Sequence, residues 1–336
     1  MAGPRGLPHG PRLSLRQADA CRGVRGLACR LAAPQRRHVI RALPHRAPFD
    51  GRAMLEYLGR DPHDAVDVVA GATYRRVVDL ESNRAAVELR FEGGETRLRT
   101  AGWERTPHRD ERARMREAAA RIVSADVDLS AFARAVAGDP LMAELVARFR
   151  GVKVPQTPTP FDALTWAILG QQISTAFAHA LKRRLAVAHG EPLTVRGAAW
   201  HALPRPERLA CLDPEALTVL GTTRAKSRAI VGAARAVAAG SLDFAALEGL
   251  ETEAAIERLC ALHGVGRWTS EYVAMRGLGR TDSLPAGDVA LQRAAATRYG
   301  SRYRSPEGLR RLARRWRGWE SYATFYLWRT LSKPAG

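Results

Sequence analysis

The sequence predicts an α+β protein that is mostly helical, with a small amino-terminal α/β domain ahead of a longer helical region. Two patterns predict this class. Between His38 and Arg99, apolar and polar residues alternate as they do in half-buried strands. From Arg112 onward, apolar residues recur at a spacing of about 3.6, which is typical of helices. The length of 336 residues is enough for two or three domains with hydrophobic cores.

The amino-terminal domain, residues 37–108, is expected to combine short strands with one helix. The predicted helix, Gly51–Leu58, places Met54, Leu55 and Leu58 on one face. Strands are predicted over His38–Leu43, Val66–Leu80, Ala85–Phe91 and Thr96–Arg99. The domain shows no catalytic constellation of its own. Ahead of it, residues 1–36 are rich in Arg, Gly and Pro with Asp19 as their single acid, and they predict a disordered basic tail.

Amphipathic periodicity predicts a succession of helices in the rest of the chain. They are expected over Arg112–Val123, Leu129–Ala137, Pro140–Phe149, Phe161–Gly170, Arg224–Ala239, Thr252–Leu262, Arg267–Gly277, Asp288–Tyr299, Pro306–Trp316 and Trp319–Leu331. One more helix is expected after Gln171–Ser174, ending near His189. Thr252 is the predicted N-cap of its helix.

The charge balance favours a polyanionic partner. With 53 Lys and Arg against 34 Asp and Glu, the net charge is +19, which favours nucleic acid over a membrane surface. The chain is also rich in Ala, Arg and Gly throughout, so charge alone does not decide the function. No apolar run is long enough to span a membrane. We expect a monomer in the cytoplasm, associated with the nucleoid. The four cysteines form no C-x-x-C pair and the histidines no H-x-x-x-H pair, so no metal site is predicted.

The stretch from Leu262 to Tyr272 is the most informative part of the chain. Helices at 252–262 and 267–277 are joined by four residues, two of which are Gly264 and Gly266. So sharp a reversal requires glycine where φ is positive. It also points the unpaired N–H groups of the second helix outward, where they can bind a phosphate. The alternative interpretation is a plain αα-hairpin with glycine at the helix end.

The hairpin Leu262-His263-Gly264-Val265-Gly266-Arg267-Trp268-Thr269, followed by Asp288 after a proline, resembles the helix-hairpin-helix superfamily of DNA base-excision glycosylases. The likeness extends to Ala167–Ser174, to Leu220–Lys226 and to Arg46–Asp50, and it covers about residues 38–332. Within the superfamily the sequence is similar to the branch of DNA-3-methyladenine glycosylases. The resemblance implies two helical subdomains with a cleft between them. These are residues 109–157 with 281–333, and residues 158–280, which contain the helix-hairpin-helix at 252–277.

The resemblance assigns roles to individual residues. Asp288 occupies the catalytic position, where a carboxylate stabilises the positive charge that develops on the sugar. An Asp at a helix start is also a common N-cap, and the two roles are compatible. Trp268, Tyr272 and Trp328 are expected to line the pocket for the flipped base, with core packing as the alternative. An electron-rich indole favours a cationic, alkylated purine.

DNA contacts are implied for residues of two segments: Gln171, Gln172, Gly264, Val265, Gly266, Arg267 and Thr269. Gln172 stands where the family inserts a side chain into the space left by the flipped base. Its alternative is a solvated glutamine at a helix start. The resemblance also implies that the hairpin carbonyls can hold a monovalent cation, and no other cofactor is expected.

The absence of one lysine distinguishes base release alone from base release with strand cleavage. Relatives that also cleave the strand carry a lysine directly after the Gly-x-Gly-Arg of the hairpin, and that position is Trp268 here. We therefore predict a monofunctional glycosylase that releases alkylated purines from double-stranded DNA and leaves an abasic site. The alternatives are a bifunctional glycosylase/lyase for oxidised bases and a non-catalytic helix-hairpin-helix protein that binds damaged DNA.

Overall fold

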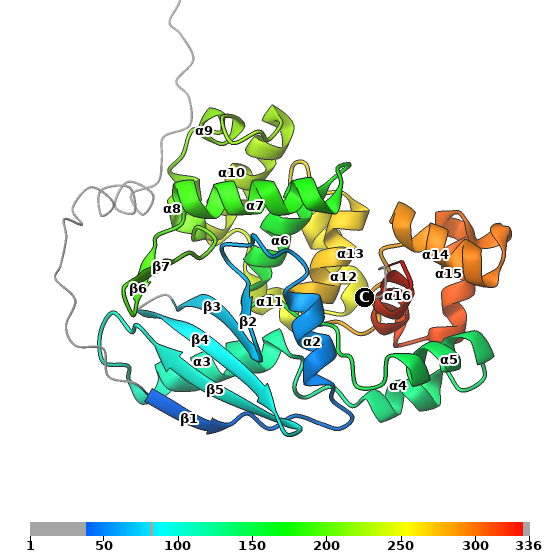
Figure 1. Cartoon of the computed structure of the whole chain (residues 1–336). Coiled ribbons are helices and arrows are strands. Elements are labelled where there is room, and N and C mark those ends of the chain that lie inside the picture. Colours follow the sequence, from blue (N-terminus) through cyan, green and yellow to red (C-terminus); the bar gives the residue numbers. More distant parts are fainter. Residues whose placement is uncertain (1–37, 81–82, 332–336) are drawn as a thin grey trace, which may run out of the picture.

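The computed structural model describes residues 38–80 and 83–331, so the predicted basic tail at residues 1–36 lies outside the described residues. The expected α+β class, with a small antiparallel sheet before a helical core, is confirmed. Figure 1 shows the sheet on one side of the molecule and the helices gathered in two groups beside it. Within the described ranges, no helix is long and apolar enough to cross a membrane.

The sheet belongs to the amino-terminal part of the chain. Its strands, antiparallel throughout and in the spatial order β1-β5-β4-β3-β2, are β1 (His38–Ala42), β2 (Val68–Ala70), β3 (Thr73–Leu80), β4 (Asn83–Glu92) and β5 (Glu95–Ala101). The single strand predicted over Val66–Leu80 is wrong. It is a hairpin, because Gly71 has a φ of +55° and turns the chain between β2 and β3.

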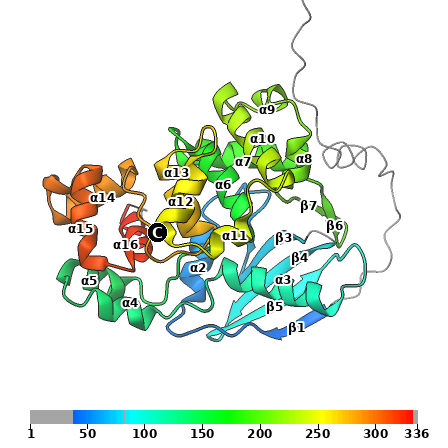
Figure 2. The ribbon, with the colours of Figure 1, turned by 180° about the vertical axis from the view of Figure 1, so that it is seen from behind.

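The helices form two groups. The first contains α3 (Arg109–Ile122), α4 (Leu129–Ala135), α5 (Pro140–Arg148), α14 (Val289–Tyr299), α15 (Pro306–Ala313) and α16 (Glu320–Arg329). The second contains α6 (Pro160–Gly170), α7 (Thr175–His189), α8 (Pro206–Ala210), α9 (Glu215–Thr218), α10 (Arg224–Ala238), α11 (Phe244–Glu248), α12 (Thr252–Cys260) and α13 (Arg267–Arg276). Seen from behind in Figure 2, α3 lies across the sheet, while α2 (Gly51–Leu58) lies between the sheet and the helices.

Three elements in the middle of the chain have no counterpart in the prediction: α8, α9 and α11, each five residues or shorter. A small hairpin, β6 (Leu193–Val195) with β7 (Ala198–Trp200), is also new. Leu193 and Val195 pack against Val77 and Ala86 of the large sheet. The hairpin therefore attaches the second helix group to the amino-terminal sheet.

Two large hydrophobic clusters follow this division. One joins the inner face of the sheet to α3–α5 and α14–α16, and the other fills the space between α6 and α13. The sheet and the first helix group thus share a continuous core. Trp328 packs against both clusters, which places it on the boundary between the two groups.

Asp139 holds the first helix group together at a buried position. It is the N-cap of α5, since its side chain accepts a hydrogen bond from the Met142 amide at 3.2 Å. Its other oxygen accepts from the indole Nε1 of the fully buried Trp316 at 3.0 Å. Replacing this side chain removes a cap and leaves a buried indole N–H without a partner.

We predict that Asp139→Ala lowers the free energy of unfolding by about 2–4 kcal/mol, combining roughly 1 kcal/mol for the cap with the cost of an unsatisfied buried donor. Asp128→Ala is the matched control. Asp128 caps α4 at a more exposed position and holds no indole, so its loss should cost about 1 kcal/mol. Urea denaturation of both variants measures the difference, and equal losses would contradict the role given to the Trp316 contact.

Candidate active site

Asp288 lies where three helices meet. It is the N-cap of α14, and its Oδ1 accepts a hydrogen bond from the Leu291 amide at 2.7 Å. The indole Nε1 of Trp328, on α16, donates to the same oxygen at 3.1 Å, and the Nε1 of Trp268, on α13, donates to Oδ2 at 3.1 Å. Both carboxylate oxygens are therefore fixed in direction while the group stays half-buried. The predicted cap is present, and it leaves the carboxylate on the wall of a cleft.

The three predicted pocket aromatics lie next to one another. The ring centroids of Trp268 and Tyr272 are 5.8 Å apart, and those of Tyr272 and Trp328 are 6.4 Å apart. Tyr272 is only 8% exposed, and burial raises the pKa of its phenol. All three rings border the same cleft. For Tyr272 the two interpretations hold together, because the residue belongs to the hydrophobic core and also lines the cleft.

The cleft has a volume of about 1010 Å³ and is lined by residues from both helix groups and from the amino-terminal part of the chain. Four side chains that the sequence did not predict also line it: Tyr57, Arg60, Trp166 and Arg293. The Arg276 guanidinium donates to the Tyr57 hydroxyl at 2.7 Å. Burial alone would raise the pKa of Tyr57, but the positive charges of Arg276 and Arg60 outweigh it and lower the value to about 8. No local motif marks Tyr57 or Arg60, because the fold brings them to the cleft from some 200 residues away.

The two hairpin glycines have different reasons to be glycine. Gly264 has a φ of +78°, and an added Cβ would lie 2.7 Å from the Cβ of Ala229. Gly266 has an ordinary φ of −92° as the N-cap of α13, and an added Cβ would meet nothing within 4 Å. The first helical bond of α13 runs from the Ser270 amide to the Gly266 carbonyl. The preceding N–H groups thus have no partner in the helix, and the space beside the Cα of Gly266 is open.

The residues predicted to contact DNA divide into two kinds. Gln171 and Arg267 are bound within the protein: Gln171 Nε2 donates to the Gly264 carbonyl and to Thr269 Oγ1, and the Arg267 guanidinium pairs with Glu253 and Glu271. Val265 is buried. Gln172 is exposed at the edge of the cleft with a φ of +54°, a backbone conformation that a residue other than glycine rarely adopts. Direct contact with DNA stays a prediction for all of them.

The lysines of the described chain make their contacts within the protein. Lys226 donates to the Leu169 carbonyl at 2.8 Å, Lys153 is buried and donates to the Ala125 carbonyl at 2.9 Å, and Lys182 pairs with Asp64 and Asp67. No lysine borders the cleft within residues 38–80 and 83–331. The arrangement offers a carboxylate rather than an amine as the reactive group.

A group of potential metal ligands lies outside the cleft. The nitrogen and oxygen atoms that Asp61, Asp64 and His179 could offer lie within 4.8 Å of one another. The sequence predicted no metal site, since its cysteines and histidines show no metal-ligand pattern at short spacing. His179 is more than a hundred residues from the two aspartates, so local spacing could not reveal this group.

Two protein families match the chain. The AlkA N-terminal domain matches residues 40–158, and the HhH-GPD superfamily base excision DNA repair protein matches residues 165–318. A DNA-3-methyladenine glycosylase of Bacillus subtilis is 36% identical over 207 residues, covering 61% of this chain and 68% of the relative. A probable bifunctional transcriptional activator/DNA repair enzyme AlkA of Mycobacterium tuberculosis is 34% identical over 296 residues, covering 87% of this chain but 57% of the relative.

Solved structures agree on the fold. A 3-methyladenine DNA-glycosylase from Archaeoglobus fulgidus matches with a TM-score of 0.74 and 24% identity, over 87% of this chain and 97% of that one. An 8-oxoguanine glycosylase/lyase from Clostridium acetobutylicum matches with a TM-score of 0.61 and 16% identity, over 75% of this chain and 87% of that one. By sequence and by fold, this chain belongs to the HhH-GPD superfamily of base excision DNA repair proteins and carries an AlkA N-terminal domain ahead of the glycosylase core.

Proposed function

We propose that this protein hydrolyses the N-glycosidic bond of alkylated purines of the 3-methyladenine type in double-stranded DNA, leaving an abasic site for base excision repair. The observation that carries the proposal is the carboxylate of Asp288, which two indole N–H groups and a helix N-terminus orient beside a cleft lined by aromatic rings. The names of the curated relatives, DNA-3-methyladenine glycosylases among them, support it.

The chemistry follows from the charges. As the base leaves, positive charge develops on the sugar, and an oriented carboxylate stabilises that charge and can orient the attacking water. Three donors hold Asp288, so little reorganisation is needed when the charge appears. An alkylated purine is cationic and stacks favourably on the indole of Trp268. Its weakened glycosidic bond reduces the need for a general acid.

DNA is the macromolecular partner of this superfamily fold, and the hairpin is the proposed contact with its backbone. The N–H groups of the first turn of α13 can bind a phosphate without reading the sequence. Gln172, exposed at the edge of the cleft, is the proposed side chain that fills the space left by the flipped base. Action as a monomer and a monovalent cation at the hairpin carbonyls both remain predictions of the family resemblance.

Two other functions are less well supported. A glycosylase/lyase needs an amine near the sugar, and Trp268 stands in the position where such relatives carry lysine. A non-catalytic DNA-binding protein would have no need for a carboxylate fixed by three donors at the cleft. Both alternatives are tested by scoring free base and strand nicks separately, on duplexes that each carry one defined lesion.

We predict that Asp288→Asn lowers the rate of base release by about 10²-fold or more while damaged duplex is still bound. The amide removes the negative charge but retains an oxygen that can cap α14. Asp282→Asn is the control, because Asp282 is exposed and accepts a bond from Thr252 outside the cleft. Wild-type-like release by Asp288→Asn would overturn the assignment, and strand nicks without alkali from the wild type would favour the lyase.

We predict that Trp268→Phe and Trp328→Phe each slow single-turnover base release about tenfold, since each removes a hydrogen bond to a charged group but keeps an aromatic ring. Trp103→Phe is the matched control. Its indole N–H donates to Thr100 Oγ1 at 3.0 Å outside the cleft, so its loss should leave the rate unchanged. If all three variants behave alike, the two indoles do not position Asp288.

We predict that Gly266→Ala weakens binding of damaged and undamaged duplex about fivefold, because its methyl group stands where a phosphate would approach. Its melting temperature should stay within about 3 °C of the wild type, since the position has room and an ordinary φ and only the N-cap preference for Gly over Ala is lost. Gly264→Ala is the companion variant and should instead lower the melting temperature, because its φ is +78° and its Cβ would meet Ala229. Unchanged DNA affinity in Gly266→Ala would argue against the hairpin as the phosphate site.

A further inference from the structure

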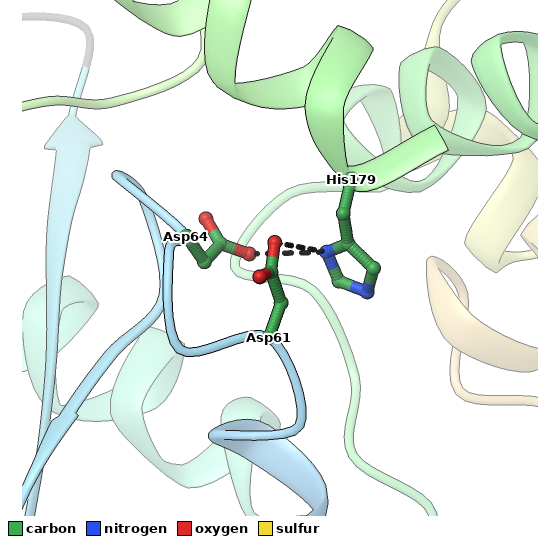
Figure 3. Close-up of side chains that lie close together, drawn as sticks. All are labelled: Asp61, Asp64 and His179. Carbon is green, nitrogen blue, oxygen red and sulfur yellow. Dashed lines mark ion pairs between the residues drawn. The ribbon is translucent and has the colours of Figure 1, made fainter. Parts of the chain in front are cut away.

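A cluster of two aspartates and one histidine lies where the loop after α2 meets helix α7, with Asp64 and His179 buried and Asp61 half-buried. Figure 3 shows the carboxylates of Asp61 and Asp64 and the imidazole of His179 pointing toward one another. His179 Nδ1 lies 3.5 Å from Asp61 Oδ2 and 3.4 Å from Asp64 Oδ2. The two aspartates come from the amino-terminal part of the chain and the histidine from the second helix group, so the cluster bridges these parts.

His179 is a buried polar side chain without a hydrogen-bond partner. It is 7% exposed, and neither of its ring nitrogens makes a hydrogen bond. Buried polar atoms are nearly always satisfied, so an imidazole whose Nδ1 meets two carboxylates only at ion-pair distance, without a hydrogen bond, indicates a missing partner between them. Its ring packs against Trp166 with centroids 4.8 Å apart, which leaves the Nδ1 edge toward the aspartates.

The charge around this cluster is not balanced by the protein. Lys182 pairs with Asp64 at 2.7 Å and also with Asp67, and Arg76 pairs with Asp67 and Asp162, both at 2.6 Å. Among these described residues, four carboxylates with Asp61 included face Lys182 and Arg76, which leaves an excess of two negative charges beside a neutral His179 and of one beside a protonated His179. Buried charge without compensation is strongly unfavourable, and a divalent cation beside Asp61 and Asp64 would remove the excess.

The donor set and its spacing identify the cation. Zinc takes imidazole nitrogen and carboxylate oxygen, and a tetrahedral ion with bonds of about 2.0–2.2 Å separates its ligands by about 3.3–3.6 Å. The distances of 3.4 and 3.5 Å from His179 Nδ1 to the two carboxylates fall in this range. We propose that Asp61, Asp64 and His179 bind one Zn²⁺, with water as the fourth ligand, at a site separate from the cleft.

The role of such an ion would be structural. It would join the loop after α2 to the second turn of α7, and α7 begins directly after the segment of Gln171 and Gln172. His179 also supports Trp166, which borders the cleft. The ion would thus fix the helix that follows the proposed DNA-contacting segment. The proposal does not depend on the chemistry assigned to Asp288.

The experiment titrates Zn²⁺ into chelator-treated, tag-free, full-length protein in competition with a chromophoric chelator. We expect one Zn²⁺ per chain, together with a rise in melting temperature of roughly 5 °C when zinc is 100-fold above its Kd. Asp61→Asn and His179→Gln should each weaken zinc binding at least tenfold. His63→Gln is the matched control, since it removes an exposed imidazole from the same loop and should bind zinc as the wild type does.

Zinc K-edge X-ray absorption of the wild type adds a readout that needs no variant, should Asp61→Asn or His179→Gln fail to fold. We expect a first shell of nitrogen and oxygen with a single imidazole and no sulfur. Failure of the wild type to bind zinc stoichiometrically would overturn the proposal. So would zinc binding that survives in both ligand variants, is lost in His63→Gln, or shows sulfur in the first shell.

Discussion

The hydrogen bonds to Asp288 are the constraint on which the geometry of the cleft depends. Trp268 belongs to α13 in the second helix group, whereas Trp328 and the Leu291 amide belong to α16 and α14 in the first. One carboxylate therefore accepts donors from both sides of the cleft. A charged acceptor makes each of these bonds stronger than a neutral one. The same contacts that orient this carboxylate also link the two helix groups across the cleft.

The amino-terminal part of the chain contributes to the site as well as to stability. It shares a hydrophobic core with the first helix group and reaches the second through buried ion pairs from Arg76 to Asp162 and from Lys182 to Asp67. These links hold α2 against the cleft, and Tyr57 and Arg60 come to line it. The positive charges of Arg60 and Arg276 limit which bases can enter the cleft. A cationic base binds only if its attraction to the aromatic rings exceeds its repulsion by these two guanidinium groups.

Sequence patterns predicted elements better than the contacts between them. The hairpin glycines and the N-cap at Asp288 depend on neighbouring residues, so they can be read locally. The predicted N-cap at Thr252 is wrong. Helix α12 is capped at Glu251, and the Thr252 hydroxyl instead donates to Asp282, thirty residues away. Arg267, whose contact with DNA stays a prediction, pairs with Glu271 one turn along α13 and also with Glu253 across the hairpin. Pairs between residues of different helices form only when the helices pack, so the periodicity of the sequence does not predict them.

The position of Trp268 explains how one fold can carry two chemistries. The glycosylase/lyase of Clostridium acetobutylicum shares this fold at 16% identity, so the arrangement of helices does not determine which reaction occurs. An amine at the start of α13 would act as a nucleophile toward C1′. An indole there cannot, and its N–H instead donates to the Asp288 carboxylate. An indole in place of the lysine thus removes a nucleophile and supplies a donor to the carboxylate that we propose to be catalytic. In the proposed reaction, water is then the species that attacks the sugar.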